Sequence, residues 1–368
     1  MNNNVNMRQL ALILLVIIPG GKYLTLPSML AKQIGTDGWI VISAMLLVDL
    51  VCLTFVCWAI NLNDRYSLKD ILYMTLGKFV TKIIFAVFAL FLLARMVTLL
   101  TSTYQVFSAS FAINTNWLGF YIPVFAVVVF VLSRGFNALA RVNEVLFTLI
   151  VICVICMLVY PATNADWHEL MPIMTSAGKM FETMTNYSFW FTDYIFVYFL
   201  LADVKKQNNV LPVTLVCFVV GSAFAIFMNM VFGALYGNTA QYYNPAMSKV
   251  SQFAVLASIS GRLDWLFLSV WMMSIFIKLC VLMFSAYRSI CYLLEIIKPT
   301  VNWWVVAFIG AVGMSPLFLP VEQWLENALR VLKYPFAAVQ YVLPLLMPLL
   351  VTVAHRKTVR GGISHEHT

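Results

Sequence analysis

The stretch PGGKYLTLP, residues Pro19–Pro27, lies in the middle of the first long apolar segment of the chain. Two adjacent glycines, a proline at each end and a lysine destabilise a continuous helix at this position. Inside a bilayer, backbone groups released from a helix are tolerated only where they line a cavity or contact other protein. We therefore expect a broken first helix, with Gly20 and Gly21 facing a cavity. The alternative is a proline kink that serves packing alone.

The residues around this break have the composition of an integral membrane protein. Of the 368 residues, 62% are hydrophobic and 10% are charged, whereas soluble domains carry about 25% charged residues. A transmembrane helix needs roughly 20 apolar residues. The sequence therefore predicts a single all-α transmembrane domain of about ten helices, with a more polar external loop or interfacial helix at 240–262. The predicted helices lie near 9–33, 39–60, 80–110, 119–133, 141–160, 182–201, 210–236, 264–294, 302–319 and 331–353.

The positively charged residues indicate how the chain crosses the membrane. With ten spans and both termini in the cytoplasm, 14 Lys and Arg residues fall on the inner side and 6 on the outer side. This asymmetry follows the positive-inside rule, and we expect 354–368 to form a cytoplasmic tail. The same bias accounts for most of the net charge of +8, and no basic patch for nucleic acid is visible.

The sequence contains none of the catalytic motifs HExxH, GxSxG or a P-loop. Cys153 and Cys156 have CxxC spacing inside a predicted helix, where buried apolar packing explains them better than a redox or metal site. The residues HEH at 365–367 lie in the predicted tail. We therefore predict no enzymatic activity, no metal site and no cofactor.

Besides Lys22, four ionisable residues are predicted to lie at membrane depth: Asp49, Arg95, Asp193 and Lys278. One charged side chain at the centre of a bilayer costs about 2.5–3.5 kcal/mol or more, so these groups must pair, contact water or meet a ligand. We expect Arg95, Asp193 and Lys278 to share a polar cavity; the alternative is an Asp193 ion pair that sets helix register. Asp49 is expected to be satisfied by a neighbouring helix without a functional role.

The sixth predicted helix contains NYSFWFTDY, Asn186–Tyr194, a polar and aromatic mixture that suits the wall of a small-molecule pocket. The stretch has no Gly or Pro, so the residues alone do not predict a break in this helix. Ten spans, a broken first helix and a polar sixth helix are typical of transporters built from five-plus-five inverted repeats, in which helices one and six line a central site.

Short motifs in matching order, spread over nearly the whole chain, connect the sequence to a known family. They are Leu24–Pro27, Asp37–Ile40, Leu76–Lys78, Ala140–Arg141 with Glu144, and Arg262–Trp265 leading into Trp271–Lys278. On these motifs the chain resembles the endospore germination permease family, the B subunits of nutrient germinant receptors within the amino acid–polyamine–organocation superfamily.

The resemblance implies a ligand-sensing subunit in the inner membrane of a bacterial spore. Such a subunit acts in a complex with a larger A subunit and a C-subunit lipoprotein. A small nutrient such as an amino acid, a sugar or a nucleoside would occupy its central pocket. A proton-coupled amino-acid permease, anchored in the bacterial cell membrane by the same fold, remains the alternative function, and a purely structural scaffold is a third.

By motif position the resemblance also implies which residues form the pocket. They are Gly20 and Gly21, Phe91 and Arg95, Lys278 and Leu282, and, more loosely, Thr192 and Asp193. Lys22 departs from the pattern, because a small residue normally occupies its place. With an excess of cations over Asp193, we expect a ligand that carries negative charge, such as an amino acid whose carboxylate lies at the first-helix break. Alternatively, Asp193 and Lys278 neutralise each other and Arg95 alone faces the carboxylate, or Lys278 takes the place of a coupling cation.

Overall fold

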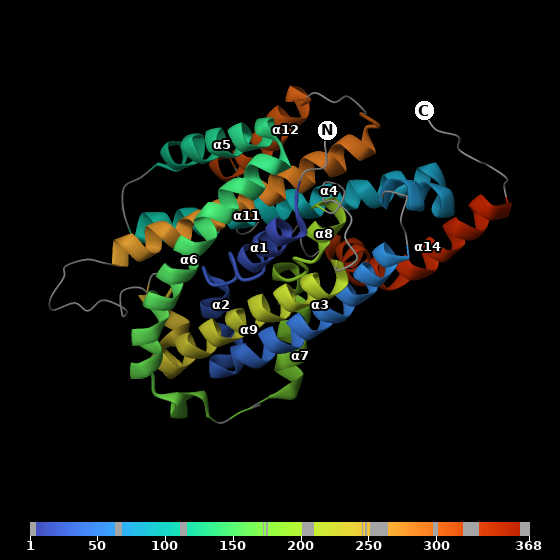
Figure 1. Ribbon diagram of the computed structural model, residues 1–368. Coiled ribbons are helices and arrows are strands. Elements are labelled where there is room, and N and C mark those ends of the chain that lie inside the picture. The colour runs from blue at the N-terminus through green and yellow to red at the C-terminus, as the bar shows by residue number, and fades with distance from the viewer. Residues whose placement is uncertain are drawn as a thin grey trace.

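The protein forms an all-helical bundle (Figure 1). The computed structural model describes residues 5–62, 68–110, 116–171, 173, 176–200, 210–244, 246, 249–250, 264–296, 301–318 and 331–360. Within these ranges seven helical segments are long and apolar enough to cross a membrane: Leu26–Asn61, Leu68–Ser110, Trp117–Arg134, Phe136–Asn164, Leu211–Tyr242, Met272–Leu293 and Val331–Arg356. Met7–Ile17 and Trp303–Leu317 are shorter apolar helices. The prediction of an all-α membrane protein is confirmed.

The first predicted helix is broken where the sequence indicated. Helix α1 (Met7–Ile17) ends and α2 (Leu26–Ile34) begins on either side of a non-helical stretch, 18–25, which we call the helix-one break. Gly21 lies within this break at φ +87°, a conformation that only glycine adopts without strain. Pro27 occupies the first turn of α2, where its missing N–H leaves no hydrogen bond unmade.

The sixth predicted helix, near 182–201, is also broken, which the sequence did not indicate. The chain passes from α7 (Ala177–Tyr187) through a short 3₁₀ turn, η3 (Ser188–Trp190), to α8 (Ile195–Leu200). The non-helical residues 191–194 between them are the helix-six break. Thr192 has φ +71° there, so the break depends on a left-handed conformation at a residue with a branched side chain.

Most of the other predicted spans coincide with helices. These are α3 (Gly38–Asn61), α5 (Trp117–Arg134), α6 (Phe136–Asn164), α9 (Val210–Tyr236), α11 (Asp264–Leu293) and α12 (Trp303–Gly313). Helix α4 (Leu68–Ser110) begins earlier than the predicted 80–110, because its first turns precede a kink at Gly77, which has φ +80°.

The last helix differs from its prediction in two respects. Residues 331–337 are helical, Ala338–Val342 form a π-helical turn, and α14 (Leu343–Arg360) follows. Residues 354–360 therefore continue the helix beyond its predicted end at 353. One-turn π-helices occur often at functional sites in helices, and this one lies beside the helix-six break, where Tyr194 donates a hydrogen bond to the carbonyl of Gln340.

Parts of several predicted features lie outside the described residues. They are 251–262 of the external loop, Arg262 and Leu263 of the family motif, the ends of two predicted spans at 201 and 319, and 361–368 with the HEH sequence. Six of the cations used for the orientation also fall there: Arg65, Lys205, Lys206, Arg262, Lys298 and Arg330. The predicted placement of both termini in the cytoplasm stays a prediction.

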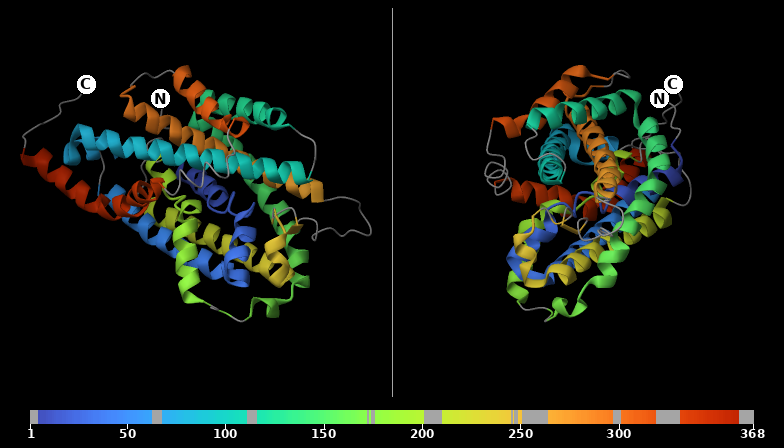
Figure 2. Two further views of the ribbon diagram at one scale, coloured as in Figure 1. Left: turned by 180° about the vertical axis from the view of Figure 1, so that it is seen from behind. Right: turned by 90° about the vertical axis from the view of Figure 1, so that its left-hand side faces the viewer.

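The two helix breaks lie in the interior of the bundle. Helix α1 is surrounded by α6, α9 and α11, and α4 runs along α11 over much of its length (Figures 1 and 2). Apolar side chains on the outer faces of the helices are exposed, among them Val145 at 77% and Trp304 at 86%. Such a surface suits lipid, while Asp49, Arg95, Asp193 and Lys278 are buried.

Candidate ligand-binding site

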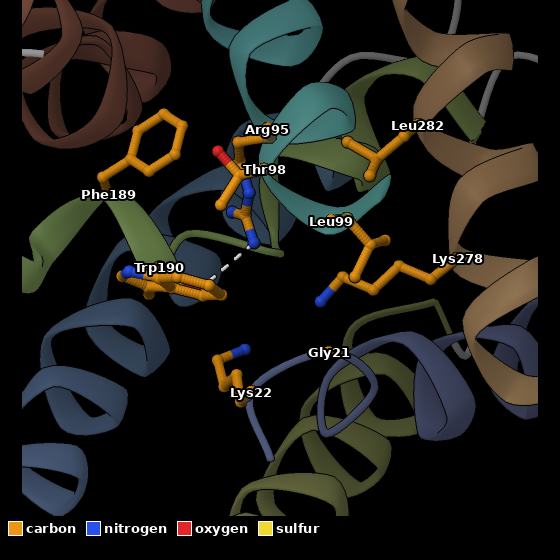
Figure 3. Close-up of a pocket in the computed structure, with 9 residues that line it drawn as sticks. All are labelled: Gly21, Lys22, Arg95, Thr98, Leu99, Phe189, Trp190, Lys278 and Leu282. Carbon is orange, nitrogen blue, oxygen red and sulfur yellow. Dashed lines mark hydrogen bonds between the residues drawn. The ribbon is translucent and has the colours of Figure 1, made fainter. Parts of the chain in front are cut away.

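Four charged side chains converge between the two helix breaks. Lys22 comes from the helix-one break, Arg95 from α4, Asp193 from the helix-six break and Lys278 from α11. Each of them is at most 7% exposed. Figure 3 shows the nitrogen ends of the three cations directed toward the space between the breaks. We call these four residues the charge cluster.

Asp193 is the common partner of all three cations. Nη2 of Arg95 lies 2.8 Å from Oδ1 of Asp193, and Nζ of Lys278 lies 3.1 Å from each carboxylate oxygen. Nζ of Lys22 also donates to Oδ2. The structure does not have the alternative arrangement in which Asp193 pairs with Lys278 and leaves Arg95 alone, because one carboxylate receives three cations from three different elements.

The same cations also satisfy backbone carbonyls that the breaks release. Lys22 Nζ donates to the carbonyl of Ile18 at 2.6 Å, and Lys278 Nζ donates to the carbonyl of Ile17 at 2.8 Å. These carbonyls lie at the end of α1, where unpaired oxygens and the helix dipole concentrate negative charge. The lysines thus replace the hydrogen bonds that a continuous first helix would make.

Arg95 has the corresponding role at the helix-six break. Its guanidinium donates to the carbonyl of Trp190 at 3.3 Å, drawn as a dashed line in Figure 3, and to the carbonyl of Phe191. A planar guanidinium presents several donors in a fixed geometry. Arg95 therefore binds both the side chain of Asp193 and the backbone carbonyls of Trp190 and Phe191.

A cavity opens beside the charge cluster (Figure 3). The cavity and the open solvent at its mouth together comprise about 310 Å³, and its lining residues are Gly21, Lys22, Arg95, Thr98, Leu99, Phe189, Trp190, Lys278 and Leu282. Five of these were predicted. Thr98 and Leu99 were not, although they follow Arg95 by three and four residues and so share its helix face. Phe189 and Trp190 belong to the aromatic stretch Asn186–Tyr194. The sequence predicted this stretch as a pocket wall but did not single out these two residues.

Four predicted site residues lie around the cavity without lining it. Gly20 packs near Lys278, whose Cδ is 3.7 Å from the position of an added Cβ. Phe91 is buried between the rings of Phe189 and Phe336, with centroid distances of 5.5 and 5.3 Å. Thr192 and Asp193 form the backbone and carboxylate of the helix-six break. These four residues therefore lie next to the cavity but are not part of its lining.

Asp49, which we expected to be satisfied by a neighbouring helix, adjoins the same region. It is 0% exposed, and its Oδ2 accepts a hydrogen bond of 2.6 Å from the backbone N–H of Thr192. Asp49 and the three cations therefore hold consecutive residues of one break. The cost of burying this carboxylate predicts from the sequence that Asp49 needs a partner. It does not predict that the partner is the backbone N–H of Thr192.

Comparison with known proteins identifies the family. No curated protein matches the chain. A family model described as spore germination protein, a spore permease, matches residues 4–322, which is most of the chain. The family assigned from the short motifs is thereby confirmed, together with the multi-pass membrane character that the apolar helices indicate. The protein is therefore a helical membrane protein that belongs to the spore germination permease family.

Proposed function

We propose that this protein is the ligand-sensing B subunit of a nutrient germinant receptor. In this proposal a small nutrient with a carboxylate group, such as an amino acid, binds in the cavity between the two helix breaks. The observation that carries the proposal is the imbalance of the charge cluster, in which three buried cations surround one buried carboxylate. Lys22, Arg95 and Lys278 all line the cavity, whereas Asp193 does not.

The chemistry of the cavity favours an anionic group of small size. Each unpaired charge at membrane depth costs about 2.5–3.5 kcal/mol or more, and a ligand carboxylate would offset part of this cost. Gly21 has no side chain, so a ligand would approach the backbone of the helix-one break closely. Phe189 and Trp190 offer an apolar wall for the rest of the nutrient.

Binding would act on the contact between the two breaks. Asp193 joins the helix-six break to Lys22 of the helix-one break and to two surrounding helices. A ligand carboxylate that shares these cations with Asp193 would weaken that junction and favour a different arrangement of the breaks. We propose that this change is passed to the A subunit and the C-subunit lipoprotein in the spore inner membrane, with both termini of this chain in the cytoplasm.

A proton-coupled amino-acid permease is the second candidate. Transporters of related plan place substrate and coupling ion at broken helices near the middle of the bilayer. The observation in its favour is the position of Lys278, whose ammonium group binds the released carbonyl of Ile17 as a coupling cation would. The same cavity would serve either function, so the two differ in turnover and not in the residues that bind.

The proposal is tested by Arg95→Leu in spores that carry the complete receptor. The response to carboxylate nutrients should be abolished, while the amount of protein in the membrane stays normal. Arg134→Leu is the matched control, because Arg134 lies at the end of α5 beside Phe130 and outside the cavity. An unchanged dose response in Arg95→Leu would refute carboxylate recognition at this site.

A transport assay distinguishes the two candidate functions. The chain alone is reconstituted into vesicles and supplied with labelled amino acids. A receptor subunit should bind without net uptake, whereas rapid concentrative uptake by the lone chain would favour the permease.

A further inference from the structure

Asp49 has an unusual environment for a carboxylate in the middle of a membrane helix. It is 0% exposed within α3, and one oxygen accepts the N–H of Thr192 at 2.6 Å. Its other oxygen, Oδ1, has no hydrogen-bond partner among the described residues. The nearby cations Lys22 and Arg95 make their ion pairs with Asp193. An ionised Asp49 thus keeps a buried charge that one backbone N–H compensates only in part.

Further polar groups surround this carboxylate on the side of the π-helical turn. Tyr194 interacts with the thiol of Cys52, one turn after Asp49 on α3, and donates its own hydroxyl to the carbonyl of Gln340. The hydroxyl of Tyr198 and the amide nitrogen of Gln340 are buried and lack hydrogen-bond partners in the described part of the chain, and the hydroxyl of Tyr341 interacts with Ser188. Uncharged polar groups of the helix-six break, α8 and the π-helical turn therefore lie on this side of α3.

The charged and titratable groups that face Asp49 come from several elements. They are Lys22 from the helix-one break, Arg95 from α4, Asp193 and Tyr194 from the helix-six break, Tyr341 from the π-helical turn and Cys52 from α3 itself. Helix α9, which packs along α3, has no charged residue in its sequence. Because Lys22 and Arg95 both make their ion pairs with Asp193, no cation among the described residues pairs with Asp49 alone.

Protonation of Asp49 would remove the cost of its buried charge. A proton on Oδ1 removes the buried charge and turns an acceptor without a donor into an O–H donor. It also weakens the hydrogen bond from Thr192, because an ionised acceptor makes the stronger bond. Thr192 adopts φ +71°, a conformation that costs free energy and persists only when surrounding contacts hold it. The bond to Asp49 is one of these contacts.

We propose that Asp49 is a proton-binding residue that takes up a proton from water and releases it again, and that its protonation state controls the geometry of the helix-six break at Thr192. Ionised Asp49 holds the backbone of Thr192 in its left-handed conformation, and protonated Asp49 releases it. Asp193 is the residue after Thr192. When the bond between Asp49 and Thr192 is lost, the position of Asp193 and of the cations bound to it therefore changes relative to the cavity. This last step, the effect on nutrient binding, rests on the function proposed above.

The proposal is tested by infrared difference spectroscopy of the full chain in lipid nanodiscs, without any nutrient, as the pH is changed. A protonated carboxyl group has a C=O stretching band that is separate from the bands of carboxylates. The wild type should still show such a band above about pH 5, where exposed carboxyl groups are already ionised, and lose it as the pH rises further. Asp49→Asn should lack the band. Asp37→Asn is the matched control and should retain it, because Asp37 is a buried aspartate roughly 18 Å away along α3.

Asp49→Glu provides a second test that keeps the carboxyl group. It should retain a titrating band at a shifted frequency or with a shifted midpoint, so the proposal stays testable if Asp49→Asn does not fold. A titrating band that persists in Asp49→Asn would overturn the proposal, as would a wild type in which Asp49 stays ionised throughout. Displacement of the band by sodium at constant pH, absent with potassium, would mean that Asp49 binds a metal cation instead.

The test separates this proposal from the function proposed above. The band does not depend on a nutrient, so a wild type that titrates at Asp49 and does not respond to carboxylate nutrients would refute only the sensing function. Conversely, a normal nutrient response in a protein without the band would refute only the proton site.

Discussion

Nη2 of Arg95 lies 2.8 Å from Oδ1 of Asp193, and this contact joins α4 to the helix-six break deep inside the bundle. Asp193 does not line the cavity, but all three cations bound to it do. The carboxylate of the protein and the proposed carboxylate of a ligand would therefore bind the same cations from opposite sides. The charge cluster is thus a junction between the two breaks.

Asp193→Asn should destabilise the protein strongly. It leaves three buried cations without their anion, and removing one partner of a buried ion pair costs about 3–5 kcal/mol. We expect a clearly lower midpoint of thermal unfolding in detergent or nanodiscs. Asp70→Asn, in the first turn of α4 outside the cluster, is the control and should change the midpoint little. An unchanged midpoint in Asp193→Asn would show that the cluster does not stabilise the fold.

Lys278→Met should weaken the response to carboxylate nutrients without unfolding the protein. Asp193 keeps two cations, and methionine occupies much of the space of the lysine stem. A hydrogen bond to a charged group contributes about 1.5–3 kcal/mol, which corresponds to roughly a 10- to 100-fold higher nutrient concentration at half response. Lys179→Met on exposed α7 is the control. Dose–response curves of spores that agree within error for the two variants would contradict the role of Lys278.

Gly21→Ala should damage both the fold and the cavity. Gly21 has φ +87°, and a Cβ placed there would lie 2.8 Å from Cδ1 of Leu99. The left-handed conformation alone costs an L-residue about 1–2 kcal/mol, and the methyl group would enter the cavity.

The matched control for Gly21→Ala is Gly178→Ala. Gly178 lies in the first turn of α7 with no atom within 4 Å of an added Cβ, and alanine there should be neutral or slightly stabilising. Thermal unfolding and the nutrient response are measured for both variants. Equal behaviour of the two would mean that the helix-one break tolerates a side chain.

Glu295 should make the stability of the protein depend on pH. Oε1 of Glu295 lies 2.9 Å from Nζ of Lys78 and 3.2 Å from Nζ of Lys82, so the end of α11 is tied to the start of α4. Hydrogen bonds from Lys78 and Lys82 lower the pKa of Glu295 from 4.5 to about 2. Because the folded pKa is depressed, the stabilisation is present above pH 4.5 and is lost as the pH falls toward about 2.

Glu295→Gln checks this sign directly. At neutral pH the variant should unfold at a lower temperature than the wild type, and the difference should shrink as the pH falls from 4.5 toward 2. A difference that stays constant over this range would mean that the ion pairs of Glu295 do not contribute.

The helix-one break and the helix-six break illustrate what the sequence can predict about this fold. Gly20 and Gly21 between two prolines predict a break from local sterics alone, and the structure has it. Phe191–Tyr194 contains neither Gly nor Pro, so no local rule applies. That break is stabilised by distant residues: Asp49 binds the N–H of Thr192, and Arg95 binds the carbonyl of Phe191.

The sequence by itself determined that this protein spans a membrane as helices, that its first helix breaks at two glycines, and that the charges in its spans need partners. Composition, chain sterics and the cost of burying a charge are properties of residues and apply before any fold is known. Only the tertiary structure decided that Lys22, Arg95 and Lys278 all converge on Asp193, and that Asp49 holds Thr192. Which partner a buried charge finds depends on how helices far apart in sequence pack, and a hydrogen bond or ion pair forms only at the few ångströms that this packing sets.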